Sequence, residues 1–150
     1  MSYQNLTTGR FSETGCAYSL TMVTDRRIPH FKEFAKARYL INEMRMLHEK
    51  ELVKSLAWVL MPDHLHWLLI VNETHLSEIV RIFKGKSSFD LKKSFHLNGV
   101  FWQRGFYDHA LRKEEDLRAA ARYIVANPLR AGLVDSIADY PHWDAAWMVD

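Results

Sequence analysis

The chain has 150 residues, 48% of them apolar, which is enough to bury one hydrophobic core, so we expect a single domain over residues 1–150. Its net charge of +2 is too small to indicate a partner by itself. It contains no run of 18 or more apolar residues, and its polar start lacks the apolar core of a signal peptide. Because the single cysteine, Cys16, cannot form an internal disulfide, we expect a cytoplasmic protein.

Strand and helix patterns alternate along the first half of the chain. Residues 16–24 combine β-branched and aromatic residues with alternation, which predicts a strand. Residues 32–50 carry apolar side chains at helical spacing, which predicts an amphipathic helix. Two apolar runs, 55–61 and 64–71, flank a Pro-Asp turn and predict a hairpin. Because these two runs are apolar on both faces, we expect both strands to be central in the sheet.

The second half of the chain completes a mixed fold. Residues 76–95 predict a second helix and 107–112 a further strand. A third helix, acid-rich in its first turns, should start after residue 112 and stop near Pro128. Residues 129–150 suggest a short tail helix and an aromatic end packed on the core. We therefore predict an α+β fold: a ferredoxin-like βαββαβ antiparallel sheet with helices on one face, followed by a C-terminal helix.

A histidine pair marks the start of the second hairpin strand. Because side chains two residues apart point to the same face of a strand, His64 and His66 could share a metal ion. The adjoining turn places them at an end of the sheet, where a substrate can reach. The alternative is that they only cap the strand end in a polar rim, since a chain with eight histidines can form such a pair by chance.

Tyr123 and Asn127 lie one helical turn apart on the third predicted helix, and therefore on one face. The tyrosine could act as a nucleophile and the asparagine oxygen as a third metal ligand. The alternative is structural, because Tyr123 lies among Leu117, Ala121 and Ile124 and could be a core aromatic residue. An asparagine before a proline is also an ordinary helix end.

Basic side chains concentrate in one segment, residues 81–112, with seven cations against two acids. Aromatic residues are interleaved with them, a combination that suits single-stranded nucleic acid because bases stack on rings while cations follow phosphates. The alternatives are a solvated helix face and ordinary core packing. The cations are Arg81, Lys84, Lys86, Lys92, Lys93, Arg104 and Arg112.

In combination, these features resemble a known family of DNA-cutting enzymes. The stretches AWVLMPDHLHWLLIV, FWQRGFYDHALRKEEDLRAAARYIVANPLRAGLV and DYPHW are similar to the IS200-like tyrosine transposases of the HUH endonuclease superfamily. The closer similarity is to the branch associated with repetitive extragenic palindromes (REP). The opening GCAYSLTMVTDRRIPHF also resembles that branch, so the similarity spans roughly residues 15–143.

The resemblance implies roles for individual residues. His64 and His66 correspond to the family's metal-binding pair, and Tyr123 corresponds to its nucleophile. The REP-associated branch has asparagine at the position of Asn127, where IS200-type enzymes have glutamine. Tyr107 is the main rival nucleophile, but it lies off the helix that carries the family's tyrosine. The DNA-binding set that we expect is Lys84, Lys86, Lys92, Lys93, Arg104 and Arg112, with the first two on a helix similar to the family's DNA-contacting one.

The resemblance also implies a reaction, a cofactor and a partner. The expected reaction is cleavage and transfer of single-stranded DNA through a 5′-phosphotyrosine intermediate, assisted by Mg²⁺ or Mn²⁺. The expected partner is DNA with a hairpin beside the cleavage site. A monomer is favoured as the active form, and a helix-exchanging homodimer is the alternative. Three alternatives remain: a catalytically silent hairpin-binding module, a zinc hydrolase with His109 as third ligand, and an RNA-binding ferredoxin-like domain.

Overall fold

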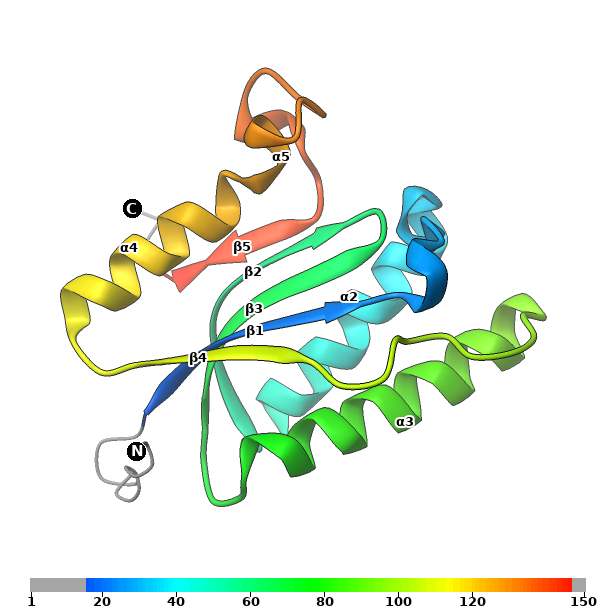
Figure 1. The fold of residues 1–150 in the computed structure, drawn as a ribbon, viewed down its shortest axis with the longest axis horizontal. Helices are drawn as coiled ribbons and strands as arrows, with labels where there is room; N and C mark the ends of the chain where they lie inside the picture. The colour runs from blue at the N-terminus through cyan, green and yellow to red at the C-terminus, as the bar shows by residue number, and fades with distance from the viewer. Residues whose placement is uncertain (1–15, 147–150) are drawn as a thin grey trace.

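A five-stranded antiparallel sheet forms the centre of the computed structural model, which describes residues 16–146 (Figure 1). The strand order across the sheet is β4-β1-β3-β2-β5. The middle positions belong to β3 and β2, the two strands of the predicted hairpin, so their central placement is confirmed. The strand bounds are β1 Ala17–Val23, β2 Val53–Met61, β3 His64–Val71, β4 Tyr107–Leu111 and β5 Trp143–Ala145.

The helices cover both faces of the sheet and enclose two apolar cores (Figure 1). On one face, α2 (Phe34–Glu49) and α3 (Leu76–Phe95) pack against side chains such as Leu20, Leu65 and Trp67. On the other face, α4 (Glu114–Val125) packs against a smaller cluster that includes Val59 and Leu68. Within residues 16–146, none of the helices combines the length and apolar character that crossing a membrane requires.

The predicted α+β class and the order of elements are confirmed. The helix predicted over 76–95 has those bounds, and the predicted strands differ from the observed ones by at most two residues at either end. The region between β1 and α2 contains two short 3-10 helices, Asp25–Arg27 and His30–Lys32, which the sequence pattern did not predict.

The C-terminal part differs from the prediction in two ways. The third helix does not end at Pro128 but breaks at Ala126 and resumes as α5 (Asn127–Arg130), with the proline in its first turn. A proline lacks the N–H that would continue the helical bonding pattern but is tolerated in a first turn, which explains the break just before it. The described part of the aromatic end, up to residue 146, packs back on the core as predicted, but through a strand, β5, paired with β2. The last part of the predicted tail, residues 147–150, lies outside the described residues.

Two phenylalanines on α3 provide a test of this packing. Phe83 is 2% exposed and meets Trp67 edge to face with ring centroids 5.5 Å apart, whereas Phe89 is 65% exposed. Because truncation in a core leaves a cavity, Phe83→Ala should lower the free energy of unfolding by about 3–5 kcal/mol. The control Phe89→Ala should change it by less than about 0.5 kcal/mol. Denaturant unfolding measures both, and equal effects would contradict the packing described here.

Candidate active site

The histidine pair lies on the sheet face that α4 covers. Strand pairing places His66 opposite Val59 and His64 opposite Met61, and both apolar partners belong to the core cluster formed with α4. Paired residues of neighbouring strands point to the same face, so the imidazoles do so as well. Their rings meet edge to face with centroids 4.7 Å apart. The predicted shared face is therefore confirmed, while metal binding stays a prediction.

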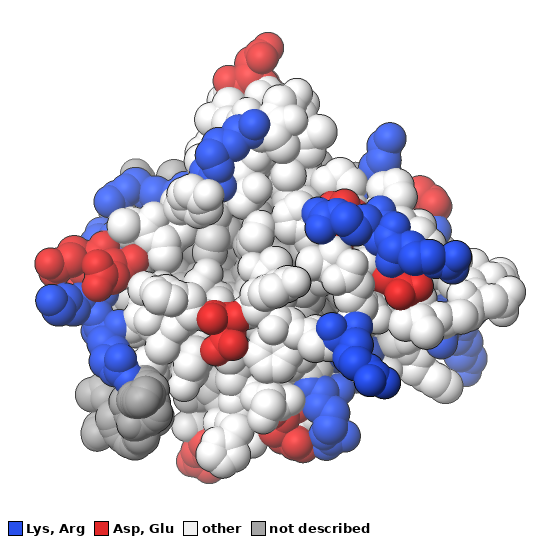
Figure 2. All heavy atoms as spheres, in the orientation of Figure 1, with Lys and Arg blue, Asp and Glu red and all other residues white. Residues whose placement is uncertain are grey.

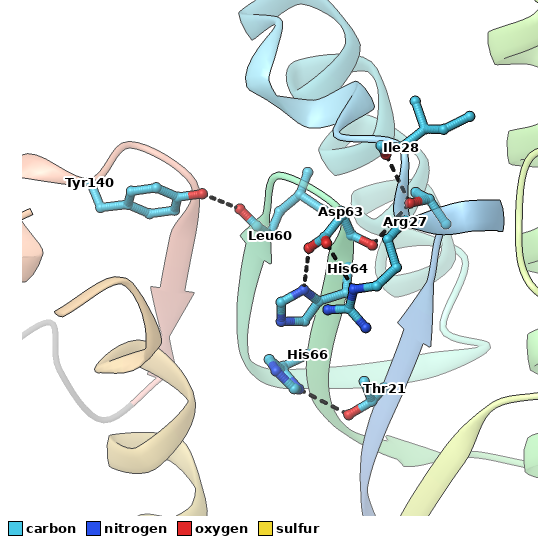
Figure 3. Close-up of polar contacts among 9 residues, drawn as sticks. Thr21, Arg27, Ile28, Leu60, Asp63, His64, His66 and Tyr140 are labelled. Carbon is cyan, nitrogen blue, oxygen red and sulfur yellow. Dashed lines mark hydrogen bonds and ion pairs between the residues drawn. The ribbon is translucent and has the colours of Figure 1, made fainter. Parts of the chain in front are cut away.

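Each imidazole is held by an oxygen atom at its Nδ1 (Figure 3). His64 Nδ1 lies 2.7 Å from Asp63 Oδ1, and His66 Nδ1 lies 2.9 Å from Thr21 Oγ1. A carboxylate only accepts hydrogen bonds, so His64 donates from Nδ1, and a threonine hydroxyl can accept in the same way. When Nδ1 carries the proton of a neutral ring, the lone pair lies on Nε2. Metal-binding histidines are typically oriented in this manner.

Asp63 has two partners that keep its side chain ionised. Arg27 Nε donates to Oδ2 at 3.0 Å, while His64 occupies Oδ1. Burial alone would raise the pKa of Asp63, but the hydrogen bond and charge of His64, together with those of Arg27, lower it below its usual value. The carboxylate therefore stays charged at neutral pH and fixes the orientation of the neighbouring imidazole.

His66 remains neutral well below physiological pH. Burial, followed by the positive charges of His64 and Arg130, lowers the pKa of His66 to about 4. A neutral imidazole is the form that binds a metal ion. The side chain is thus ready to act as a ligand without first losing a proton.

The turn that precedes the pair is anchored from two sides (Figure 3). The N–H and hydroxyl of the buried Thr24 lie 3.0 and 3.1 Å from the Asp63 carbonyl oxygen. From the other side, the Tyr140 hydroxyl donates to the Leu60 carbonyl at 2.6 Å. Burial raises the pKa of Tyr140 to about 12, so this phenol remains a donor. The backbone from which His64 projects is therefore fixed.

Tyr123 lies in the last turn of α4 with 65% of its surface exposed. The residues that α4 buries against the sheet are Ala121, Ile124 and Val125, so the phenol points away from the core. The alternative of a core aromatic residue is therefore wrong. The ring is covered by Arg130, whose guanidinium carbon lies 3.6 Å from the ring centroid.

Asn127 lies close to Tyr123 in sequence but across the helix break. It is half-buried and is the first residue of α5, after the break at Ala126. The predicted spacing of one helical turn therefore joins two helices rather than one. Its role as a metal ligand stays a prediction.

Two rival side chains lie on the same sheet face as the histidine pair. Tyr107 is paired with Thr21, which is itself paired with His66, and it is 70% exposed. Exposure alone therefore does not separate Tyr107 from Tyr123. His109 lies two residues further along β4. Among residues 16–146, no three His, Cys, Asp or Glu side chains gather to hold a metal, so a centre completed by His109 finds no support.

Lys84, one of the predicted DNA contacts, has a structural partner in the fold. Its ammonium group donates to the carbonyl oxygen of Gln103 at 2.7 Å and to that of Gly105. Burial lowers the pKa of this half-buried side chain. The contacts fasten the segment that leads into β4 to helix α3.

The other predicted DNA contacts vary in exposure. Lys86 forms an ion pair with Asp90 at 2.6 Å, and Lys92 donates to the Gly99 carbonyl at 2.8 Å. Figure 2 shows basic side chains on the α3 side of the molecule with acidic ones among them, so this surface is not uniformly positive. Four of the predicted contacts are exposed: Lys86, Lys93, Arg104 and Arg112.

Four side chains that organise the site were not predicted from the sequence. Asp63 was identified only as a turn residue, although it directly precedes the histidine pair. Arg130 follows Asn127 at helical spacing, a signal that could have indicated it. Thr21 and Arg27 are revealed only by strand register and by the path of the chain after β1.

The sequence is similar to those of known transposases. A family model described as IS200-like transposase matches residues 12–127. A Haemophilus influenzae protein named as a REP-associated tyrosine transposase is 24% identical over 148 residues, covering 88% of this chain and 80% of the relative. The Escherichia coli K12 REP-associated tyrosine transposase is 34% identical over 90 residues, covering 57% of this chain and 50% of the relative. The match therefore spans half the length of this second relative.

Two solved structures share the fold. The structure of a REP-associated tyrosine transposase bound to a REP hairpin matches with a TM-score of 0.72 at 24% identity, covering 91% of this chain and 80% of the other. The crystal structure of a Deinococcus radiodurans R1 protein described as a transposase matches with a TM-score of 0.58 at 24% identity, covering 80% and 95%. At these identities the likeness bears on the fold, and it confirms the α+β architecture.

The neutral form of His66 makes stability depend on pH. The pKa of His66 is about 4 in the folded chain and about 6.5 in the unfolded chain. The contribution of His66 to the free energy of unfolding is therefore fully present above pH 6.5 and is lost as the pH falls toward 4. The loss should be at most about 3 kcal/mol. His66→Gln, which cannot titrate, should flatten this slope in denaturant unfolding with a chelator present. Burial also lowers the pKa values of His30 and His142, so the free energy of unfolding of His66→Gln should still fall somewhat as the pH falls. Parallel slopes for the two proteins would rule the prediction out.

Proposed function

This chain belongs to the family of IS200-like transposases, and from that premise we propose that it cuts and transfers single-stranded DNA through Tyr123 with the help of a divalent metal ion. Membership of this family implies action on DNA. The preference for single strands, the metal ion and the covalent step are what we propose beyond it. The observation that carries it is the geometry of the histidine pair. Both rings share one face, and both are held at Nδ1 so that Nε2 is left for a ligand.

The residues present fit a metal ion. His64 and His66 would supply two imidazole nitrogens, and Asn127 an amide oxygen. Asp63 supplies the carboxylate behind the first imidazole, an outer contact that is typical of metal sites. When bound, Mg²⁺ or Mn²⁺ would polarise the scissile phosphate. We expect coordination by DNA oxygens as well, because two imidazoles leave most of the shell to other donors.

Tyr123 supplies the nucleophile. Its phenol oxygen forms a bond to phosphorus while the bond from phosphorus to the 3′-oxygen breaks. The proton lost by the phenol ends on the departing 3′-oxygen, which leaves a free 3′-hydroxyl and a 5′-phosphotyrosine. Because the covalent link conserves the energy of the phosphodiester, a second 3′-hydroxyl can rejoin the strand without ATP. The exposure of the phenol allows a DNA strand to reach it.

We propose hairpin-containing DNA as the partner. The support is that a structural relative with this fold is bound to a REP hairpin. Exposed cations on this chain could contact the phosphates, and Lys93 and Arg104 are exposed among those predicted. Lys84 would act through the loop that it fastens, since its ammonium faces backbone carbonyls.

A covalent-adduct assay tests the nucleophile. Wild-type protein mixed with a palindromic single strand and Mn²⁺ should give a protein–DNA adduct that survives denaturing electrophoresis. Tyr123→Phe should give none, because phenylalanine has no attacking oxygen. The matched control is Tyr107→Phe, which removes an exposed phenol on the sheet face of the histidine pair and should leave the adduct in place.

The outcomes of this assay separate the alternatives. Loss of the adduct in Tyr107→Phe alone would make that residue the nucleophile. Hairpin binding without any adduct would favour a silent binding module, and stronger binding to RNA of the same sequence would favour an RNA-binding domain. Strand hydrolysis that survives Tyr123→Phe would favour a metal hydrolase.

The carboxylate behind His64 provides a second test. Asp63→Asn keeps the shape of the side chain but removes the charge that orients the imidazole, so metal affinity should fall by about 10- to 100-fold. The measurement is the Mn²⁺ concentration that gives half-maximal adduct formation. Asp25→Asn is the control, because Asp25 pairs with Arg26 and not with the histidines. An unchanged Mn²⁺ requirement in Asp63→Asn would exclude the proposed outer contact.

A further inference from the structure

Arg130 lies on the helical face that carries the nucleophile. Positions 123, 127 and 130 follow one another at intervals of four and three residues, so their side chains align along one side of a helix. The break at Ala126 separates Tyr123 from the other two but keeps this order, since both segments are helical. Long helical side chains point back toward the N-terminus, which directs Arg130 toward the preceding helix.

The guanidinium of Arg130 covers the ring of Tyr123. Its carbon lies 3.6 Å from the ring centroid, which is a stacking distance. The ring itself is 65% exposed and lies outside both apolar cores. Core packing therefore does not hold this side chain in one orientation, whereas the stacked guanidinium restricts it.

The helices that carry the phenol and the guanidinium pack over the strands of the histidine pair. Helix α4 contacts β3, and α5 contacts β2, the strand whose residues lie opposite both imidazoles. Tyr123 and Arg130 therefore come from the two helices that lie on the sheet face of His64 and His66.

The hydrogen-bonding capacity of Arg130 is available to a ligand. The side chain is exposed, and no carboxylate within residues 16–146 forms an ion pair with it. Other arginines differ, since Arg27 is paired with Asp63 and Arg81 with Glu78. Stacking uses the flat face of a guanidinium and leaves its N–H edge free to donate.

We propose that Arg130 holds the phenol of Tyr123 by stacking and, as a catalytic residue, donates from its N–H edge to a non-bridging oxygen of the scissile phosphate. The inference rests on the proposed function, because it assumes that Tyr123 attacks a DNA phosphate. Negative charge on the phosphate oxygens must be stabilised while phosphorus is transferred. A fixed cation beside the nucleophile, on a helix that packs over the strands of the histidine pair, meets that need without rearrangement.

The test compares cleavage rate with DNA affinity in three variants. At saturating palindromic single strand and Mn²⁺, Arg130→Gln should cleave about 100-fold more slowly than wild type in a single turnover, with little change in Kd. Arg130→Lys keeps the positive charge but loses the planar group that stacks on the ring. Its cleavage rate should therefore lie between those of wild type and Arg130→Gln. Arg122→Gln, on the exposed side of α4 next to Tyr123, makes the same charge change and should cleave at nearly the wild-type rate.

Several results would overturn the inference. One is cleavage by Arg130→Gln at the wild-type rate. Another is a fall in the cleavage rate of Arg122→Gln as large as that of Arg130→Gln. The third is a slower rate in Arg130→Gln that weaker DNA binding, measured as Kd, explains entirely. Thermal unfolding is measured alongside, and if Arg130→Gln is unstable, the Arg130→Lys rate decides: full activity overturns stacking as the mechanism. If wild type forms no adduct or Tyr123→Phe still does, the proposed function fails and takes this inference with it. A wild-type adduct that requires Tyr123 but not Arg130 contradicts the inference alone.

Discussion

The hydrogen bond between Asp63 and His64 depends on a turn that is anchored from two sides, and the orientation of the histidine pair depends on that bond. The carbonyl of Asp63 is engaged by Thr24, while its carboxylate is divided between Arg27 and His64. Main-chain and side-chain atoms of one residue thus connect the end of β1 to the start of β3. Because His66 follows two residues later on the same strand, fixing the turn fixes both imidazoles.

This arrangement has a local conformational cost. Arg26 and Arg27 both have left-handed backbone angles, with φ of 54° and 52°. Such a conformation costs an L-residue about 1–2 kcal/mol. The surrounding bonds offset it, since Thr24 accepts the Arg27 N–H at 3.0 Å and Arg27 gains the charged bond to Asp63. Strain of this kind is frequent at functional sites, where surrounding contacts enforce a geometry that the local chain disfavours.

Periodicity in the sequence was sufficient to predict the elements that are long and regular. The hairpin followed from two long apolar runs around a Pro-Asp turn, and the helix over 76–95 from several repeats of helical spacing, so both type and position were predictable. Strand β5 has three residues, too few for an alternation to be recognised. The helix break was also missed, because Pro128 is compatible both with a helix end and with the first turn of a new one.

The sequence shows which residues carry charge but not in which direction their charged groups point in the fold. Lys84 belongs to a basic segment, yet its ammonium group turns inward to two backbone carbonyls. The histidine pair was predictable because two-residue spacing on a strand determines a shared face. Thr21 was not, since its position opposite His66 follows from the pairing of strands far apart in the sequence. Site residues defined by local spacing are therefore predictable, and those defined by register are not.

The two faces of the sheet differ in what they contain. The face under α2 and α3 contains the larger core and its largest buried side chains. The face under α4 contains a smaller apolar cluster, which leaves room for imidazoles at one end of the sheet.

Because α4 buries only one stripe of its surface, Tyr123 can remain in solvent without weakening the packing below it. The proposed attack on DNA requires an exposed phenol, and an exposed ring needs a partner other than the core to hold its orientation. A cation from the next helix provides that contact without closing the site to a strand.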